Sequence, residues 1–139
     1  MPQDDFVPGN VKLKIALKVY GIEQVSLVKE LPLFAALMDT RMKDLSGGER
    51  RLAEVYMVLK MKAKFVLLDE PFSYLMPLYV QKLKEIMEVE KLNKGIIITD
   101  HMYRDVKEVS DTMYLLRDGK SYKIENETQL VNLGYINKA

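Results

Sequence analysis

The sequence of 139 residues has no cysteine, a single histidine and a formal net charge of only +1. Without cysteine the chain can form neither disulfide bonds nor thiolate metal sites, which suits a reducing compartment. A charge near zero gives no electrostatic argument for binding nucleic acid or a membrane surface. No apolar run approaches the ~20 residues of a membrane-spanning helix, and the opening residues do not read as a secretory signal. The composition, 48% hydrophobic and 29% charged, is that of an ordinary globular domain.

Two adjacent carboxylates follow directly on an apolar run at residues 65–68, and Pro71 then prevents the strand from continuing. An apolar run without alternation is typical of a parallel strand that helices cover on both faces. Ligands in open α/β sheets bind beyond the carboxyl ends of the strands, so Asp69 and Glu70 are expected at a ligand-binding edge. One carboxylate could hold Mg²⁺ and the other could polarise an attacking water. A strand that ends in two solvated acids is the alternative.

A helix is predicted over residues 46–60, beginning with Ser46 and Glu49 as a capping box. The pair Gly47-Gly48 allows a ligand to approach the backbone N–H groups closely. A helix start with exposed N–H groups and a serine hydroxyl favours phosphate binding. The alternative is that these residues only cap the helix.

The only histidine, His101, follows a second apolar run at residues 96–98. Because parallel strands end at the same edge of a sheet, His101 and Glu70 are expected to lie close together. A purely structural histidine is the alternative.

Three motifs, in this order, resemble a known family: Leu45-Ser46-Gly47-Gly48-Glu49, Val66-Leu67-Leu68-Asp69-Glu70 and Thr99-Asp100-His101. They resemble the signature, the Walker B strand and the switch histidine of the ATP-hydrolysing domain of ABC transporters. Residues 1–10 resemble the Q-loop of that domain. The resemblance therefore covers nearly all of this chain but only the C-terminal part of the family's domain.

The resemblance implies a role for each matched residue and names ATP and Mg²⁺ as cofactors. Asp69 and Gln3 would support Mg²⁺, Glu70 would polarise the attacking water, and His101 would sense the γ-phosphate with Gln3. The implied catalytic residues are thus Glu70 and His101. The implied nucleotide contacts come from the Q-loop and from the signature, which clamps ATP held by another subunit: Gln3, Ser46, Gly47, Gly48 and Glu49.

No segment reads Gly-x-x-x-x-Gly-Lys-[Ser/Thr], the Walker A phosphate loop that the family has upstream of the Q-loop. The leading interpretation is the C-terminal portion of an ABC transporter's ATP-binding subunit, which couples ATP binding and hydrolysis to transport. By itself the chain is expected not to hydrolyse ATP appreciably. A second interpretation is a non-hydrolytic module that lends its signature to a chain with Walker A. A third is a truncated sequence, with Met1 an internal codon.

One departure from the family bears on that choice. After the Walker B strand the family usually has a small residue, an apolar residue and an aspartate before a proline. Here Tyr74 and Met76 stand in place of the small residue and the aspartate. In the family that aspartate couples the two ATP sites of a dimer, so the substitution puts coupling and hydrolysis in question.

The predicted fold class is α/β: a partial P-loop NTPase-like domain with a helical subdomain, a parallel sheet flanked by helices, and a C-terminal hairpin. Residues 1–10 form the Q-loop-like segment, residues 11–44 the helical subdomain, and residues 45–139 the signature, Walker B and switch-histidine core. Residues 11–20 alternate as a strand does, but the family has a helix there, and a helix is predicted. Further helices are expected at 23–31, 78–92, 103–109 and 127–133, and strands at 65–69, 95–99, 111–116 and 121–124.

The implied partners are another ABC ATP-binding subunit and a transmembrane permease subunit, with no nucleic acid. The implied location is the cytoplasm, peripheral at the inner face of the cell membrane. Because half of the family's domain has no counterpart here, a sheet edge and apolar faces would be left bare. Self-association or domain swapping is therefore expected.

Overall fold

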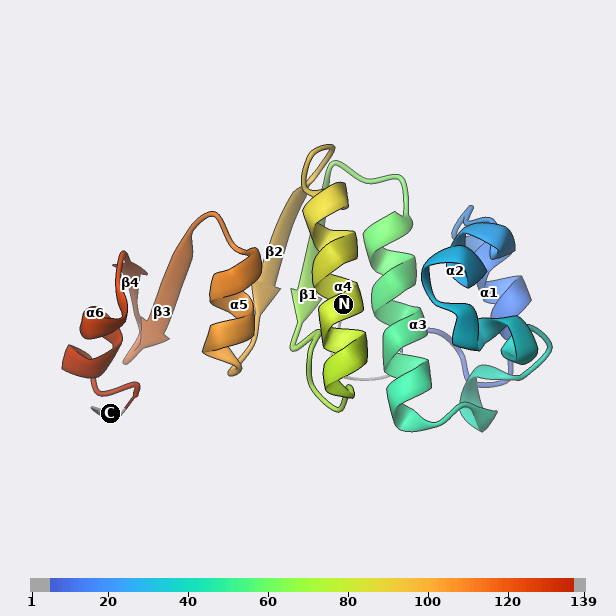
Figure 1. Ribbon diagram of the computed structural model, residues 1–139, viewed down its shortest axis with the longest axis horizontal. Helices are drawn as coiled ribbons and strands as arrows, with labels where there is room; N and C mark the ends of the chain where they lie inside the picture. Colours follow the sequence, from blue (N-terminus) through green and yellow to red (C-terminus); the bar gives the residue numbers. More distant parts are fainter. Residues whose placement is uncertain (1–5, 137–139) are drawn as a thin grey trace. The chain divides into compact units, whose positions relative to one another are not determined.

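The structure is a computed structural model, and it describes residues 6–136 (Figure 1). The chain divides into two compact units, Met1–Met102 and Tyr103–Ala139. The division of the chain at residues 10 and 44 was based on motifs and not on compact units, and it stays a prediction.

The first unit opens with short helices. These are α1 (Leu13–Val19), α2 (Gln24–Glu30) and two 3₁₀ helices, Pro32–Leu37 and Met42–Asp44. The segment at 11–20 is thus a helix, as predicted against its alternating pattern. Its buried residues are Leu13, Ala16 and Leu17, which share one helical face. Tertiary packing of that face outweighs the strand-like alternation.

The signature segment forms the central helix α3 (Gly47–Lys60), and the predicted capping box is present. The Ser46 N–H donates to Glu49 Oε2 at 2.8 Å, and the Glu49 N–H donates to Ser46 Oγ at 3.3 Å. Every residue from 52 to 59 is buried. Helix α4 (Pro77–Glu90) begins with proline, whose missing N–H costs nothing at that position. It packs alongside α3 (Figure 1).

Strands β1 (Phe65–Asp69) and β2 (Gly95–Thr99) pair in parallel, with Asp69 opposite Thr99 at their carboxyl ends. The prediction that the β1 strand is covered on both faces is wrong for this unit. Val66 and Leu68 are buried, but Phe65 is 68% and Leu67 is 60% exposed. Helix α3 packs on β1, and within residues 6–102 no element covers the face that bears Phe65 and Leu67.

The second unit contains α5 (Tyr103–Val109), β3 (Met113–Arg117), β4 (Lys120–Ile124) and α6 (Glu127–Asn132). Strands β3 and β4 form the predicted antiparallel hairpin. Its turn residues Asp118 and Gly119 have φ of 50° and 72°, the left-handed region that an Asp-Gly turn supplies. Among the described residues, β3 pairs with β4 and not with the parallel pair. Leu115, Ile124 and Leu130 form the core of this unit.

The predicted α/β class is confirmed, with a helical segment, a parallel strand pair, helices and a terminal hairpin. Across residues 6–136, none of the helices has the length and apolar character required to cross a lipid bilayer.

Candidate nucleotide site

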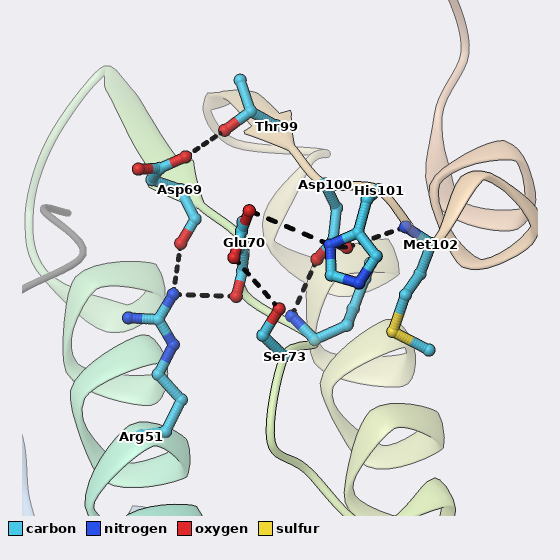
Figure 2. Close-up of polar contacts among 9 residues, drawn as sticks. Arg51, Asp69, Glu70, Ser73, Thr99, Asp100, His101 and Met102 are labelled. Carbon is cyan, nitrogen blue, oxygen red and sulfur yellow. Dashed lines mark hydrogen bonds and ion pairs between the residues drawn. The ribbon is translucent and has the colours of Figure 1, made fainter. Parts of the chain in front are cut away.

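Glu70 stands immediately beyond β1 in a conformation that is unusual for a residue with a side chain. Its φ is 47°, in the left-handed region. Its N–H donates to the Thr99 carbonyl at 2.7 Å, which ties it to the end of β2. Its own carbonyl accepts from Arg51 Nη2 at 2.8 Å (Figure 2). Backbone contacts from two neighbouring elements therefore hold Glu70 in place.

The Glu70 carboxylate lies close to the only histidine of the chain. Glu70 Oε1 is 3.8 Å from His101 Nδ1, and Glu70 Oε2 accepts from Ser73 Oγ at 3.3 Å (Figure 2). The His101 side chain is 68% exposed and that of Glu70 is 36% exposed, so an incoming ligand can reach both. The expected meeting of Glu70 and His101 at one sheet edge is confirmed.

Asp69 is the last residue of β1, and its Oδ1 accepts from Thr99 Oγ1 at 2.6 Å across the strand pair. Within residues 6–136 no group of three or more acidic or imidazole side chains is arranged to hold a metal ion. A single carboxylate still fits Mg²⁺, which keeps several waters and takes its other ligands from substrate phosphates. The other predicted ligand, Gln3, lies outside the described residues.

The start of α3 borders the same region as Glu70. Gly47, Arg51, Glu70, Ser73 and Tyr74 line a groove of about 440 Å³. A methyl group added at Gly47 would meet no atom within 4 Å, whereas one added at Gly48 would lie 3.3 Å from the Tyr74 carbonyl oxygen. Open space therefore lies beside the Cα of Gly47, and the approach of a ligand to the N–H groups stays a prediction. Ser46 and Glu49 cap the helix at this point, so both also have a structural role.

Three residues that the sequence did not single out build this site. Arg51 Nη2 donates to the carbonyls of both Asp69 and Glu70. Ser73 contacts Glu70, and the fully buried Asp100 carboxylate accepts from Phe72 N at 3.1 Å and Met102 N at 2.9 Å. Asp100 thereby joins the end of β2 to the loop after Glu70. Asp100 lies inside the motif Thr99-Asp100-His101, and Arg51 and Ser73 follow shortly after a motif, but no role was assigned to them from the sequence.

Of the two residues that depart from the family pattern, Tyr74 lines this groove and Met76 lies two residues further along the chain. Tyr74 is 90% exposed and has a φ of 64°, and Met76 is the N-cap of α4 with no side-chain cap hydrogen bond. An aspartate at the Met76 position would cap α4 and carry a charge to the surface. The methionine supplies neither.

The sequence relatives of this chain are ATP-binding proteins of transport systems. No family model matches the sequence. The chain is 36% identical over 110 residues to a lipopolysaccharide export system ATP-binding protein, LptB, of Acidithiobacillus ferridurans, covering 78% of this chain and 45% of that protein. It is 39% identical over 84 residues to LptB of Escherichia coli strain K12, covering 60% of this chain and 35% of that protein. The chain is thus homologous to part of ABC transporter ATP-binding proteins.

A third ABC relative broadens the match beyond one transporter type. It is an energy-coupling factor transporter ATP-binding protein, EcfA2, of Mycoplasmoides gallisepticum, 31% identical over 76% of this chain and 35% of that protein. The chain spans less than half of the length of these ABC relatives.

Solved structures show the same fold. One is described as the structure of the ATP binding subunit of an ABC transporter, with a TM-score of 0.76 and 18% identity over 99% of this chain and 62% of that one. Another, described as RNase-L Inhibitor, has a TM-score of 0.74 and 21% identity over 95% of this chain and 29% of that one. At these identities the match supports the ABC fold and nothing finer.

Proposed function

We propose that this chain forms the C-terminal, catalytic portion of an ABC transporter's ATP-binding subunit, which couples ATP binding and hydrolysis to transport. One observation carries the proposal: Glu70 and His101 meet where β1 and β2 end, beside a groove that extends to Gly47 at the start of α3. The names of the relatives, which are ATP-binding proteins of transport systems, support it.

In the proposed reaction Glu70 orients and polarises the water that attacks the γ-phosphate. Ser73 donates a hydrogen bond to its carboxylate, and the His101 imidazole lies 3.8 Å from it. The exposed His101 contacts the γ-phosphate of the bound ATP. Asp69 would hold Mg²⁺, which neutralises developing charge on the phosphates when it is bound. Gln3 takes part in the same contacts in this proposal.

The start of α3 serves a different nucleotide in the proposal. Its N–H groups and the positive end of the helix dipole attract the γ-phosphate of ATP held by another subunit. The open space at Gly47 lets that phosphate approach. The proposed partners are a second ABC ATP-binding subunit and, through residues 11–44, a transmembrane permease at the inner face of the cell membrane.

A second candidate function is favoured by the departures at Tyr74 and Met76 beside an intact, capped signature helix. In this candidate the chain hydrolyses no ATP itself and lends its signature to a partner with Walker A. The two candidates differ in the residue that they need. The first needs Glu70, and the second needs only the start of α3.

The first test mixes the purified chain with a separate polypeptide that ends before the Q-loop and carries the Walker A half of an ABC domain. We expect ATP hydrolysis by the mixture and essentially none by the chain alone. Glu70→Gln should abolish it, and Glu85→Gln, at an exposed acid on α4, should leave it unchanged. Hydrolysis that survives Glu70→Gln would contradict the catalytic role. Turnover by the chain alone, lost with Glu70→Gln, would show that it needs no Walker A half.

The second test uses a complete ABC ATP-binding subunit whose own signature serine is replaced. If this chain lends its signature, adding it restores hydrolysis whether position 70 is Glu or Gln. Gly47→Asp should prevent that rescue, because an acid at a helix start suits the helix dipole but repels phosphate. No rescue by the unmodified chain would rule out the second candidate.

A further inference from the structure

Two adjacent arginines on α3 reach in different directions. Arg50 donates from Nη2 to the Val7 carbonyl at 2.7 Å and from Nε to Glu54 Oε1 at 3.3 Å. Arg51 donates from Nη2 to the carbonyls of Asp69 and Glu70 (Figure 2). Both lie one turn after the helix start, and both are half-buried. The same chemical group thus serves two separate places.

The carbonyls that Arg51 holds are those of the last strand residue and of Glu70. Glu70 has a φ of 47°, a backbone conformation that is strained for a residue with a Cβ. One nitrogen that bonds two successive carbonyls fixes the two peptide planes on either side of the Glu70 Cα. The direction of the Glu70 Cα–Cβ bond follows from those planes.

The side-chain contacts of Glu70 are weaker constraints than this backbone contact. Ser73 Oγ is 3.3 Å and His101 Nδ1 is 3.8 Å from the carboxylate oxygens. A hydrogen bond at 3.3 Å and an ion-pair contact at 3.8 Å orient a carboxylate less firmly than a charge-assisted hydrogen bond at 2.8 Å holds a carbonyl. The backbone therefore decides where the carboxylate lies, and Arg51 holds that backbone.

We propose that Arg51 is a positioning residue for Glu70. It connects the signature helix α3 to the backbone that carries the Glu70 carboxylate. The catalytic meaning of this role rests on the proposed function, but the geometric link does not. A shift at the start of α3 is transmitted through one guanidinium to the loop that carries Glu70. Arg50, one residue earlier, instead bonds the Val7 carbonyl and the Glu54 carboxylate.

The first test is spectroscopic and needs no nucleotide. Because His101 is the only histidine, its imidazole gives one set of NMR signals that report on its surroundings. Arg51→Gln should shift the His101 imidazole signals and the Glu70 and Ser73 amide signals. Arg50→Gln, which removes the same charge one residue away, should shift Val7 instead. Comparable His101 shifts in both variants, or none in a folded Arg51→Gln protein, would overturn the proposal.

A variant that keeps the positive charge tests the proposal even if Arg51→Gln does not fold. Arg51→Lys retains the cation but cannot reproduce the guanidinium geometry. It should therefore shift the same NMR signals as Arg51→Gln, but by smaller amounts. If Arg51→Gln does not fold, Arg51→Lys decides: unchanged Glu70 and His101 signals would overturn the proposal.

The second test measures catalysis in the two-polypeptide mixture. Arg51→Gln should lower kcat by about 10- to 100-fold with little change in KM for ATP, because misplacing a catalytic group by about 1 Å has an effect of this size. Arg51→Lys should recover part of the loss. An equal loss in kcat/KM that comes from KM alone would contradict positioning. If the mixture shows no hydrolysis at all, the proposed function fails while the spectroscopic test still judges Arg51.

Discussion

At the scale of single residues, the two glycines of the signature should differ in how an alanine substitution changes stability. Ala at Gly47 meets open space, so Gly47→Ala should raise the free energy of unfolding by about 0.4–1 kcal/mol through lower entropy of the unfolded chain. The Cβ of an alanine at position 48 would lie 3.3 Å from the Tyr74 carbonyl oxygen. Gly48→Ala should therefore raise the free energy of unfolding by less, or lower it. Urea unfolding of both variants measures the difference. Equal gains would show that the Tyr74 loop yields without cost.

The residue scale also shows why part of the site escaped prediction from the sequence. Ser46, Asp69, Glu70 and His101 could be predicted because each sits in a local motif at a strand or helix end. The roles of Arg51 and Asp100 could not, although Asp100 lies within the motif Thr99-Asp100-His101, because both bind backbone groups far away in the sequence. Backbone carbonyls and amides carry no residue-type signal, so no sequence pattern marks their partners.

At the scale of elements, one cation joins three helices. Lys60 on α3 is 2.9 Å from Glu30 Oε1 on α2 and 3.0 Å from Glu90 Oε1 on α4. Burial lowers the pKa of Lys60, but the hydrogen bonds to Glu30 and Glu90 outweigh it and raise that pKa overall. Burial likewise raises the pKa of Glu90, but Lys60 and Lys94 outweigh it and lower that pKa overall. The ion pairs of Lys60 therefore connect α2 to the helices α3 and α4.

The signs of these shifts predict a pH dependence. The Glu90 pKa is depressed by folding, so its contribution is complete above the ordinary Glu range and is lost as pH falls through the folded pKa. The Lys60 pKa is raised, so its contribution is lost only as pH rises above the ordinary Lys range. Lys60→Met should therefore reduce the free energy of unfolding by about 1.5–3 kcal/mol near neutral pH, and by less in acid.

Urea unfolding at neutral pH and at about pH 4 measures that change, since Glu groups titrate in this range. The control is Lys82→Met, which breaks an exposed pair with Glu85 and should cost about 0–1 kcal/mol. A loss for Lys60→Met that is the same at both pH values would contradict the role of Glu90. It would assign the effect to packing of the lysine stem instead.

The elements differ in how well local pattern predicted them. Helix α3 was predicted because cap, glycine pair and apolar face all agree on one structure. The helix α1 was ambiguous because its apolar residues satisfy two periods. The burial of β1 was predicted wrongly because an apolar run reports what a strand could bury, whereas its exposure depends on which other segments pack there.

At the scale of the whole molecule, the uncovered face of the parallel pair is the feature that matters for solution behaviour. Phe65, Leu67 and Ile97 on this face are 68%, 60% and 55% exposed. Strand register places Leu67 opposite Ile97, so the exposed side chains are contiguous. Among residues 6–102 no third strand pairs with β1 or β2. Contiguous apolar surface beside open sheet edges favours association between copies.

We therefore expect the isolated chain to self-associate as its concentration rises, measured by sedimentation velocity. Ile97→Lys places a charge at the centre of the uncovered face and should shift the population toward monomer with little loss of stability, because the side chain is already exposed. Val25→Lys, at a still more exposed apolar residue on α2, should leave association unchanged. A monomer at all concentrations, or equal effects of the two lysines, would show that this face does not mediate association. If addition of the Walker A half suppresses self-association of the unmodified chain, the two processes compete for the same surface, as expected if that half covers the face in the complete domain.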